Sequence, residues 1–153
     1  MISKKREKLI ELIASNSDTV DFGCSKNAVD SLWVDKAENT LGLKFTPSYR
    51  WFLNHYAGGE ICGEEIFSVY GIDFEHACGG DIVYQHIINI KNQLTTDNKL
   101  VVSETDYGEV FYFDYSAFED NECPINVRLP SGVEKQYASD FYDFLMMRIQ
   151  AYL

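Results

Sequence analysis

The chain has 153 residues, close to the commonest size of one domain, and 46 % of them are hydrophobic. A chain of this length buries roughly 70 % of its unfolded surface, so it needs neither disulfides nor a metal to fold, and its hydrophobic content excludes intrinsic disorder. Thirteen Lys and Arg against 24 Asp and Glu give a net charge of −11, which argues against direct nucleic-acid binding because phosphate backbones are bound by cations. We therefore expect one domain over residues 1–153. Its acidity suits a basic partner, although acidity can also serve solubility alone.

The cysteines and the N-terminal segment bear on the compartment. The four cysteines are widely spaced and form no C-x-x-C pair, so neither a zinc ribbon nor a thioredoxin-like motif is present. Charged residues at Glu7, Lys8 and Glu11 interrupt the first apolar segment, unlike the core of a signal peptide. No apolar run approaches the roughly 20 residues that a transmembrane helix requires. We expect a cytoplasmic protein with reduced thiols and no membrane partner.

Helical spacing dominates the first third of the chain. Apolar residues at positions 9, 10, 12 and 13 predict a short amphipathic helix that the polar segment 15–18 ends. We expect a loop over residues 19–25, with Ser25 as the N-cap of a second helix. Gly42 suits the left-handed position that follows many helices. The buried stripe predicted for this second helix comprises Ala28, Leu32, Val34, Ala37 and Leu41.

An aromatic-rich segment follows. Pro47 fits the first turn of a third helix, where its missing N–H has no cost. The pair Gly58-Gly59 ends this helix. We expect its large side chains to lie in the core rather than to form a ligand-binding cage; they are Tyr49, Trp51, Phe52, Leu53 and Tyr56.

From residue 65 onward the pattern changes to strands. Residues 65–72 predict a strand, whereas residues 81–93 favour a helix by their length, although their apolar positions would also suit a strand. Residues 99–105 and 109–115 predict a hairpin, and 124–130 and 133–138 two more strands. Ser139 is the predicted N-cap of a last helix over residues 139–153. The fold class is therefore α+β, with a central antiparallel sheet flanked by N-terminal helices and a closing C-terminal helix.

Catalytic and metal-binding motifs do not emerge from the sequence. It contains no G-x-S-x-G elbow, no H-E-x-x-H pair and no glycine-rich loop with the lysine of a phosphate site. We expect no enzyme, no cofactor and no metal site. An enzyme that uses the glycine-containing loops 58–63 and 79–81 as a cleft is the least favoured alternative.

Acidic residues cluster in segments that we expect to be turns and loops, rather than in i,i+4 pairs with lysine on helices. If the sheet gathers these clusters at one end, they form one negative surface; otherwise they are scattered, solvated turns. We predict that they form the surface that binds a partner protein. The set comprises Glu60, Glu64, Glu65, Asp73, Glu75, Asp81, Asp106, Glu109, Glu119, Asp120 and Glu122.

Residues 33–72 resemble the Smi/Knr-type branch of the SUKH superfamily. That pattern has a helix with an acidic position, Leu-Gly, Pro-x-x-Tyr, a short helix with Phe-Leu, and Gly-Gly before a strand. The positions that match it are Glu38, Leu41-Gly42, Pro47, Tyr49, Phe52-Leu53, Gly58-Gly59 and 66–72. The resemblance extends more loosely over residues 27–150. Thr46 departs from it, because a proline or an apolar residue is common there.

The resemblance implies binding rather than catalysis. Bacterial members of the superfamily are typically immunity proteins that neutralise a toxin by direct association, and the toxin is frequently a nuclease. For this chain the implied target is the C-terminal RNase domain of an LXG-type toxin. A domain of charge −11 is suited to a basic substrate cleft. The alternative is a non-enzymatic signalling or scaffold module of the same fold.

Overall fold

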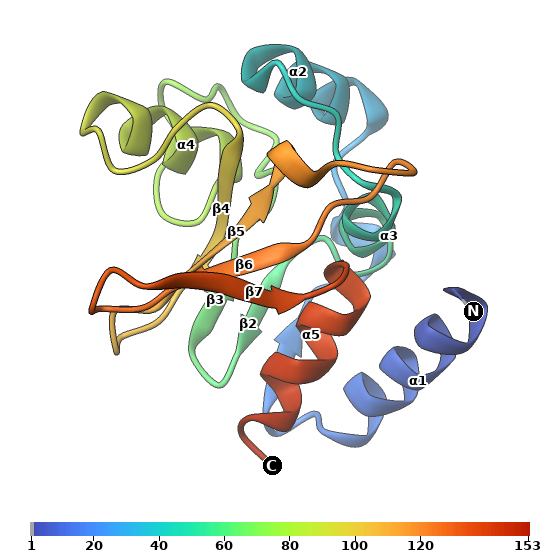
Figure 1. Cartoon of the computed structure of the whole chain (residues 1–153). Helices are drawn as coiled ribbons and strands as arrows, with labels where there is room; N and C mark the ends of the chain where they lie inside the picture. The colour runs from blue at the N-terminus through green and yellow to red at the C-terminus, as the bar shows by residue number, and fades with distance from the viewer. Residues whose placement is uncertain (1) are drawn as a thin grey trace.

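The computed structural model describes residues 2–153, with side chains from Lys4 onward. Helices lie at both ends of the chain and strands lie mainly between them, which confirms the α+β class (Figure 1). The helices are α1 (Ile2–Ser15), α2 (Ser31–Leu41), α3 (Pro47–Tyr56), α4 (Ile82–Lys91) and α5 (Phe141–Gln150). Two short 3-10 turns are η1 (Ser25–Asn27) and η2 (Tyr115–Ala117).

The strands form two antiparallel sheets rather than one. The three-stranded sheet has the order β1 (Val20–Phe22), β2 (Gly59–Ile61), β3 (Glu64–Ile66). The four-stranded sheet has the order β4 (Lys99–Glu104), β5 (Val110–Asp114), β6 (Ile125–Arg128), β7 (Glu134–Ala138). The N–H of Phe67 donates to the C=O of Val102 at 2.7 Å, so the segment after β3 connects the two sheets. The strand predicted over residues 65–72 therefore ends early, at Ile66.

Two short strands lie where the sequence predicted irregular structure. β1 falls within the expected loop 19–25, and β2 falls within the expected turn after the third helix. Each has three residues, too few to display the alternation of a strand. These strands form because β1 pairs with β2 and β2 pairs with β3. Asp21 lies opposite Glu60, and Glu60 lies opposite Glu65.

Helix α2 begins later than predicted. The Asp30 carboxylate accepts hydrogen bonds from the N–H groups of Leu32 (3.0 Å) and Trp33 (3.3 Å), so Asp30 is the N-cap. Ser25 instead opens η1. The predicted end is confirmed, since Gly42 has φ 69° and its N–H donates to the C=O of Glu38.

Two residues of the SUKH-like pattern hold α2, α3 and β3 together. Glu38 is 3 % exposed and accepts hydrogen bonds from the N–H of Phe45 (2.8 Å) and from Arg50. The hydroxyl of Tyr49, fully buried in α3, donates to the C=O of Phe67 at 2.6 Å, just beyond β3. The acidic position and the tyrosine of the pattern therefore have structural roles.

The aromatic residues of α3 form the centre of the core, as predicted. The Tyr49 ring lies 5.2 Å from Phe113 and 5.1 Å from Phe141, which joins α3 to β5 and α5. Trp51, Phe52 and Leu53 are also buried, and Tyr56 is half-buried.

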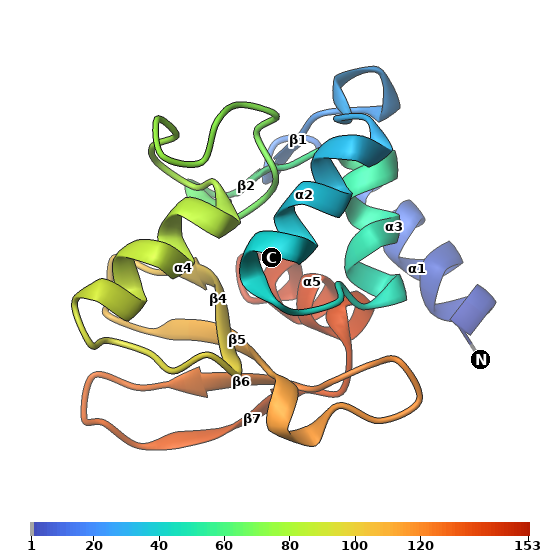
Figure 2. The same cartoon turned by 90° about the horizontal axis from the view of Figure 1, so that it is seen from above.

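Helix α5 packs against β7, α3 and α1, whereas α4 packs against β4 and α2 (Figure 2). Asp140, not the predicted Ser139, caps α5 by accepting a hydrogen bond from the N–H of Asp143 at 2.9 Å. None of the helices in residues 2–153 has the length and apolar character needed to cross a membrane.

Candidate partner-binding site

Glu64, one of the predicted surface carboxylates, is buried. It lies in β3 with 7 % exposure, and its oxygens accept hydrogen bonds from Arg148 of α5 at 2.7 and 2.8 Å. Burial raises the pKa of the Glu64 carboxyl against the opposing effect of Arg148, and nearby Glu109 and Asp106 add to that rise. Glu64 is therefore not a surface carboxylate, because its charge is paired with Arg148 inside the molecule.

Two more predicted site residues cap helices. Asp81 is fully buried and accepts hydrogen bonds from the N–H groups of Tyr84 (2.9 Å) and Tyr70 (3.0 Å) at the start of α4. Glu122 accepts from the N–H (2.9 Å) and the hydroxyl (2.8 Å) of Ser48 at the start of α3. Carboxylates at helix N-termini satisfy backbone donors and the helix dipole, which gives both residues a structural use.

The remaining predicted carboxylates reach solvent, but they lie in separate places. Two of them, Glu65 and Glu109, are half-buried. The others are exposed: Glu60, Asp73, Glu75, Asp106, Glu119 and Asp120. The turn that holds Asp106 and Glu109 precedes β5, and the loop that holds Glu119 and Asp120 follows it, so these groups lie at opposite ends of that strand. The sheet therefore does not gather the acidic clusters at one end.

A different feature stands out on the surface: apolar side chains from α2 and from the loop after β3. The Trp33 ring packs edge-on against Phe74 with centroids 5.9 Å apart. Gly71 has φ 77°, and a Cβ on it would lie 2.7 Å from a methyl of Val29, so the loop rests directly on the start of α2. We call the surface formed by Val29, Leu32, Trp33, Tyr70 and Ile72, with the buried Phe74 beneath it, the α2–loop face.

The α2–loop face is exposed and hollowed on two sides. Leu32 is 67 % exposed, Ile72 45 % and Tyr70 38 %. One hollow of about 500 Å³ is lined by Trp33, Lys36, Asn39, Thr40, Asp73 and Phe74. A second, of about 430 Å³, is lined by residues that include Val29, Tyr70, Ile72 and Glu65. Exposed apolar side chains beside concave surfaces are typical of protein-binding sites.

Several carboxylates lie beside this face, and one cation, Lys36, lies over the Trp33 ring at 4.6 Å from its centre. Asp73 and Glu75 belong to its loop, Asp30 caps its helix, and Glu65 lines its second hollow. Glu65 also ends a row of three like charges across the three-stranded sheet, with Glu60 opposite it and Asp21 opposite Glu60. Like charges directly opposite one another destabilise a sheet, so this row favours contact with a cation.

Leu32 was predicted to lie in the buried stripe of this helix but is exposed, and Trp33 was not among the predicted site residues. The buried positions of α2 are Val34, Ala37 and Glu38. Leu32 precedes Val34 by two residues, which places it about 200° away around a helix of 3.6 residues per turn. Val34, Ala37 and Leu41 follow one another at three- and four-residue steps, and Leu32 does not fit this spacing. The sequence therefore already contained a signal that Leu32 points outward.

The two glycine-containing loops of the enzyme alternative do come together. The Tyr70 hydroxyl accepts a hydrogen bond from the N–H of Gly80 (2.8 Å) and donates one to Glu65, near Gly58 and Gly59. These groups hydrogen-bond to one another, which gives them a structural use. Within the described part of the chain, no three His, Cys, Asp or Glu side chains converge as metal ligands do.

The SUKH_6 family, described as SMI1-KNR4 cell-wall, matches residues 31–145 of this chain. The matched segment runs from the first residue of α2 into α5 and includes both helices of the SUKH-like pattern and six of the seven strands. Proteins of this kind are known as immunity proteins, which bind toxins. Because the match covers well over half of the sequence, the chain belongs to the SUKH_6 family.

Proposed function

We propose that this protein is an immunity protein that binds a cognate toxin one-to-one through the α2–loop face and thereby neutralises it, without catalysis of its own. The observation that carries the proposal is the exposed aromatic and aliphatic surface with a carboxylate rim, on a chain of this family. Interfaces of this kind combine apolar anchors, which slow dissociation, with charged rims, which speed encounter.

The charge of the chain favours a basic toxin. A nuclease carries cations in its substrate cleft, and a net charge of −11 attracts such a cleft over several ångströms. The row formed by Asp21, Glu60 and Glu65 is a local match for its lysines and arginines. We infer that the chain is close to the Bacillus immunity protein YobK, and that its target is therefore the C-terminal RNase domain of an LXG-type toxin, which it binds in the cytoplasm.

Among the predicted carboxylates, we propose that Glu60, Glu65, Asp73 and Glu75 contact the toxin. They flank the α2–loop face or lie in the carboxylate row beside it. Asp106, Glu109, Glu119 and Asp120 lie at the ends of β5 and act only through the long-range field. Glu64, Asp81 and Glu122 maintain the fold and do not take part in binding.

The test uses the toxin domain encoded beside this gene, purified with the full-length protein. RNA cleavage should fall linearly with added protein and stop near a one-to-one ratio. The change Leu32→Asp places a charge on the most exposed apolar side chain of this face and should weaken the complex about 100-fold, as expected for an interface anchor. Because Leu32 is 67 % exposed, this variant should keep the stability of the parent.

A matched control is Leu94→Asp, which changes an apolar side chain of 53 % exposure beyond α4. It should alter affinity less than about threefold, as surface changes away from an interface do. Equal losses for the two variants would remove the α2–loop face from the interface. Full cleavage in the presence of equimolar protein, with no complex on size exclusion, would overturn the proposed function itself.

A further inference from the structure

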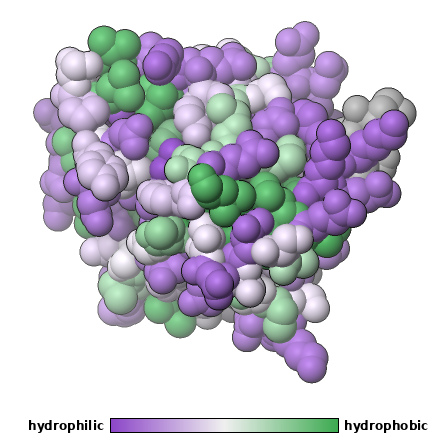
Figure 3. All heavy atoms as spheres, turned by 90° about the horizontal axis from the view of Figure 1, so that it is seen from below, coloured by the Kyte–Doolittle hydropathy of each residue, from purple (hydrophilic) through white to green (hydrophobic). Residues whose placement is uncertain are grey.

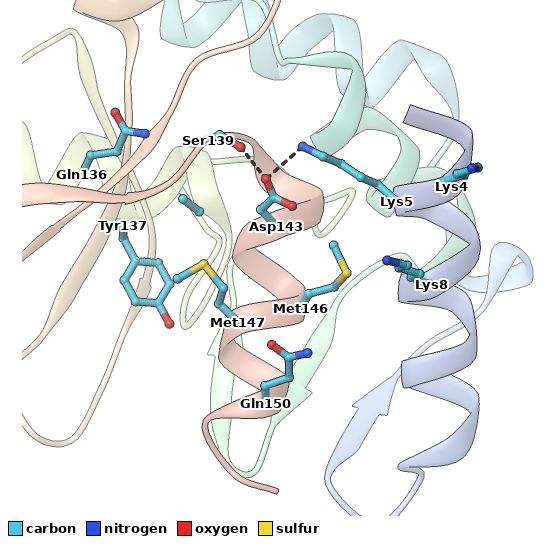
Figure 4. Close-up of a pocket in the computed structure, with 11 residues that line it drawn as sticks. Lys4, Lys5, Lys8, Gln136, Tyr137, Ser139, Asp143, Met146, Met147 and Gln150 are labelled. Carbon is cyan, nitrogen blue, oxygen red and sulfur yellow. Dashed lines mark hydrogen bonds and ion pairs between the residues drawn. The ribbon is translucent and has the colours of Figure 1, made fainter. Parts of the chain in front are cut away.

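A groove with the opposite charge lies on another part of the molecule. It is a hollow of about 700 Å³ that crosses the outer side of α5, between β7 and α1 (Figure 4). Met146, Met147 and Gln150 of α5 form its floor, and Gln136 and Tyr137 of β7 form one wall. The lysines of α1 form the other wall. Figure 1 places α1 and α5 at the end of the molecule away from α2 and α4.

The α1 wall is strongly basic. Residues 4–8, Lys-Lys-Arg-Glu-Lys, carry four cations and one carboxylate, a net charge of 4 − 1 = +3 in a chain of −11. Lys5 is already bound, because its ammonium contacts Asp140 at 2.8 Å and Asp143 at 2.9 Å. Lys4 and Lys8 are exposed and form no ion pair with any residue that the structure describes. Two lysines at the groove are therefore available to an anionic group.

The floor of the groove is apolar and adaptable. Met147 is 38 % exposed and Met146 is half-buried. A thioether side chain is flexible and polarisable, so it fits apolar partners of various shapes. A second hollow of about 340 Å³ continues along the seam of α1 and α5, and it shares Lys8, Met146 and Gln150 with the first. Seen from below, hydrophobic side chains gather in the middle of this face beside hydrophilic ones (Figure 3).

Strand β7 adds unpaired backbone groups. It is the last strand of its sheet, so one of its edges has no strand partner among residues 2–153. An extended peptide that enters the groove can hydrogen-bond to such an edge. The lysine wall belongs to a helix that lies before the segment matched by the SUKH_6 family, which begins at Ser31. The groove therefore lies between the segment that the family matches and a helix that precedes this segment.

We propose that this groove is a second docking site, for an acidic peptide segment of another protein, and that it acts independently of the α2–loop face. Carboxylates of the segment pair with Lys4 and Lys8, and an apolar side chain packs on Met146 and Met147. The net charge of −11 does not prevent the acidic segment from binding, because charges beyond about 8 Å are screened at physiological salt. Attraction to the adjacent lysines is then the largest electrostatic interaction of the bound segment.

The test titrates the full-length protein into a fluorescein-labelled peptide, acetyl-ELEDFELE-amide, and follows fluorescence anisotropy. The protein contains three methionines, so methyl labelling with carbon-13 gives a simple NMR spectrum in which the signals of Met146 and Met147 report on the floor. Both signals should shift when the peptide binds. The uncharged peptide QLQNFQLQ should bind about tenfold more weakly, the loss expected for two exposed ion pairs.

The decisive variants reverse two lysines at a time. Lys4→Glu with Lys8→Glu should weaken binding of the acidic peptide by about tenfold or more. Lys26→Glu with Lys91→Glu makes the same change in net charge at exposed positions on η1 and α4, and it should leave the affinity within about threefold. Equal losses in the two variants, unmoved methionine signals, or no binding at 1 mM peptide would overturn the proposal. So would binding confined to vesicles of anionic phospholipid, which would assign the lysines to a membrane surface.

Discussion

At the scale of single residues, Arg148 shows how a charge becomes part of the core. Its guanidinium lies 4.7 Å from the centre of the Phe111 ring and 5.9 Å from that of Tyr137, and it forms the ion pair with Glu64. The pair links the closing helix α5 to β3. Removal of one charge leaves the other buried without a partner, which costs more than removal of both.

We predict that Glu64→Leu and Arg148→Met each lower the free energy of unfolding by about 3 kcal/mol. The double variant should be more stable than either single one, because no buried charge remains. Urea unfolding of the four proteins measures the coupling between the two positions. Strictly additive losses would show that the ion pair makes no contribution beyond the packing of its two side chains.

At the scale of elements, the start of α2 illustrates how a correct type of residue was assigned to the wrong position. Both Ser25 and Asp30 are good N-caps, and both precede helical spacing. The hydrogen bonds of the backbone identify Asp30 as the N-cap of α2, because its carboxylate accepts from two N–H groups of that helix. Ser25 lies within η1. The true N-cap also holds the helix turn that presents Leu32 and Trp33 at the α2–loop face.

The change Asp30→Ala should lower the free energy of unfolding by about 1 kcal/mol, the usual cost of a lost N-cap. Ser25→Ala should change it by less than about 0.5 kcal/mol, because the N-cap of η1 is Cys24 and not Ser25. Urea unfolding of both variants at pH 7 compares them directly. A larger loss for Ser25→Ala would contradict the assignment of the helix start.

At the level of the whole molecule, charge is distributed unevenly over the surface. A net charge of −11 coexists with the +3 segment at residues 4–8, so the two proposed docking sites select partners of opposite charge. Specificity then follows from which face a partner meets, since a basic cleft is repelled by the lysine wall and attracted by the acidic rim.

For the toxin complex, an increase of ionic strength from 0.01 M to 0.15 M should slow association by about tenfold or more, because the Debye length shrinks from about 30 Å to 8 Å. Dissociation should change little, because apolar contacts retain the partner. Stopped-flow fluorescence measures both rates. An association rate independent of salt would show that the acidic rim plays no part in encounter.

Most helices, the β4–β5 hairpin and the two strands that follow were predictable from sequence, because helical spacing, caps and turn residues act within a few positions of one another. Gly42 and Pro47 are examples, and both lie where their backbone preferences place them. The SUKH-like pattern could be identified for the same reason: Glu38 and Tyr49 belong to one continuous segment.

Tertiary structure alone decided which carboxylates bind inside the molecule and which reach solvent. Glu64 meets Arg148 84 residues further along the chain, and Glu122 meets Ser48 74 residues before it. No local pattern records such pairings, because they form only when distant elements pack. The same holds for the α2–loop face, where a loop after β3 rests on α2. Local residue patterns are enough to predict the family and most of the helices, whereas the packing of distant elements determines which side chains the surface presents to a partner.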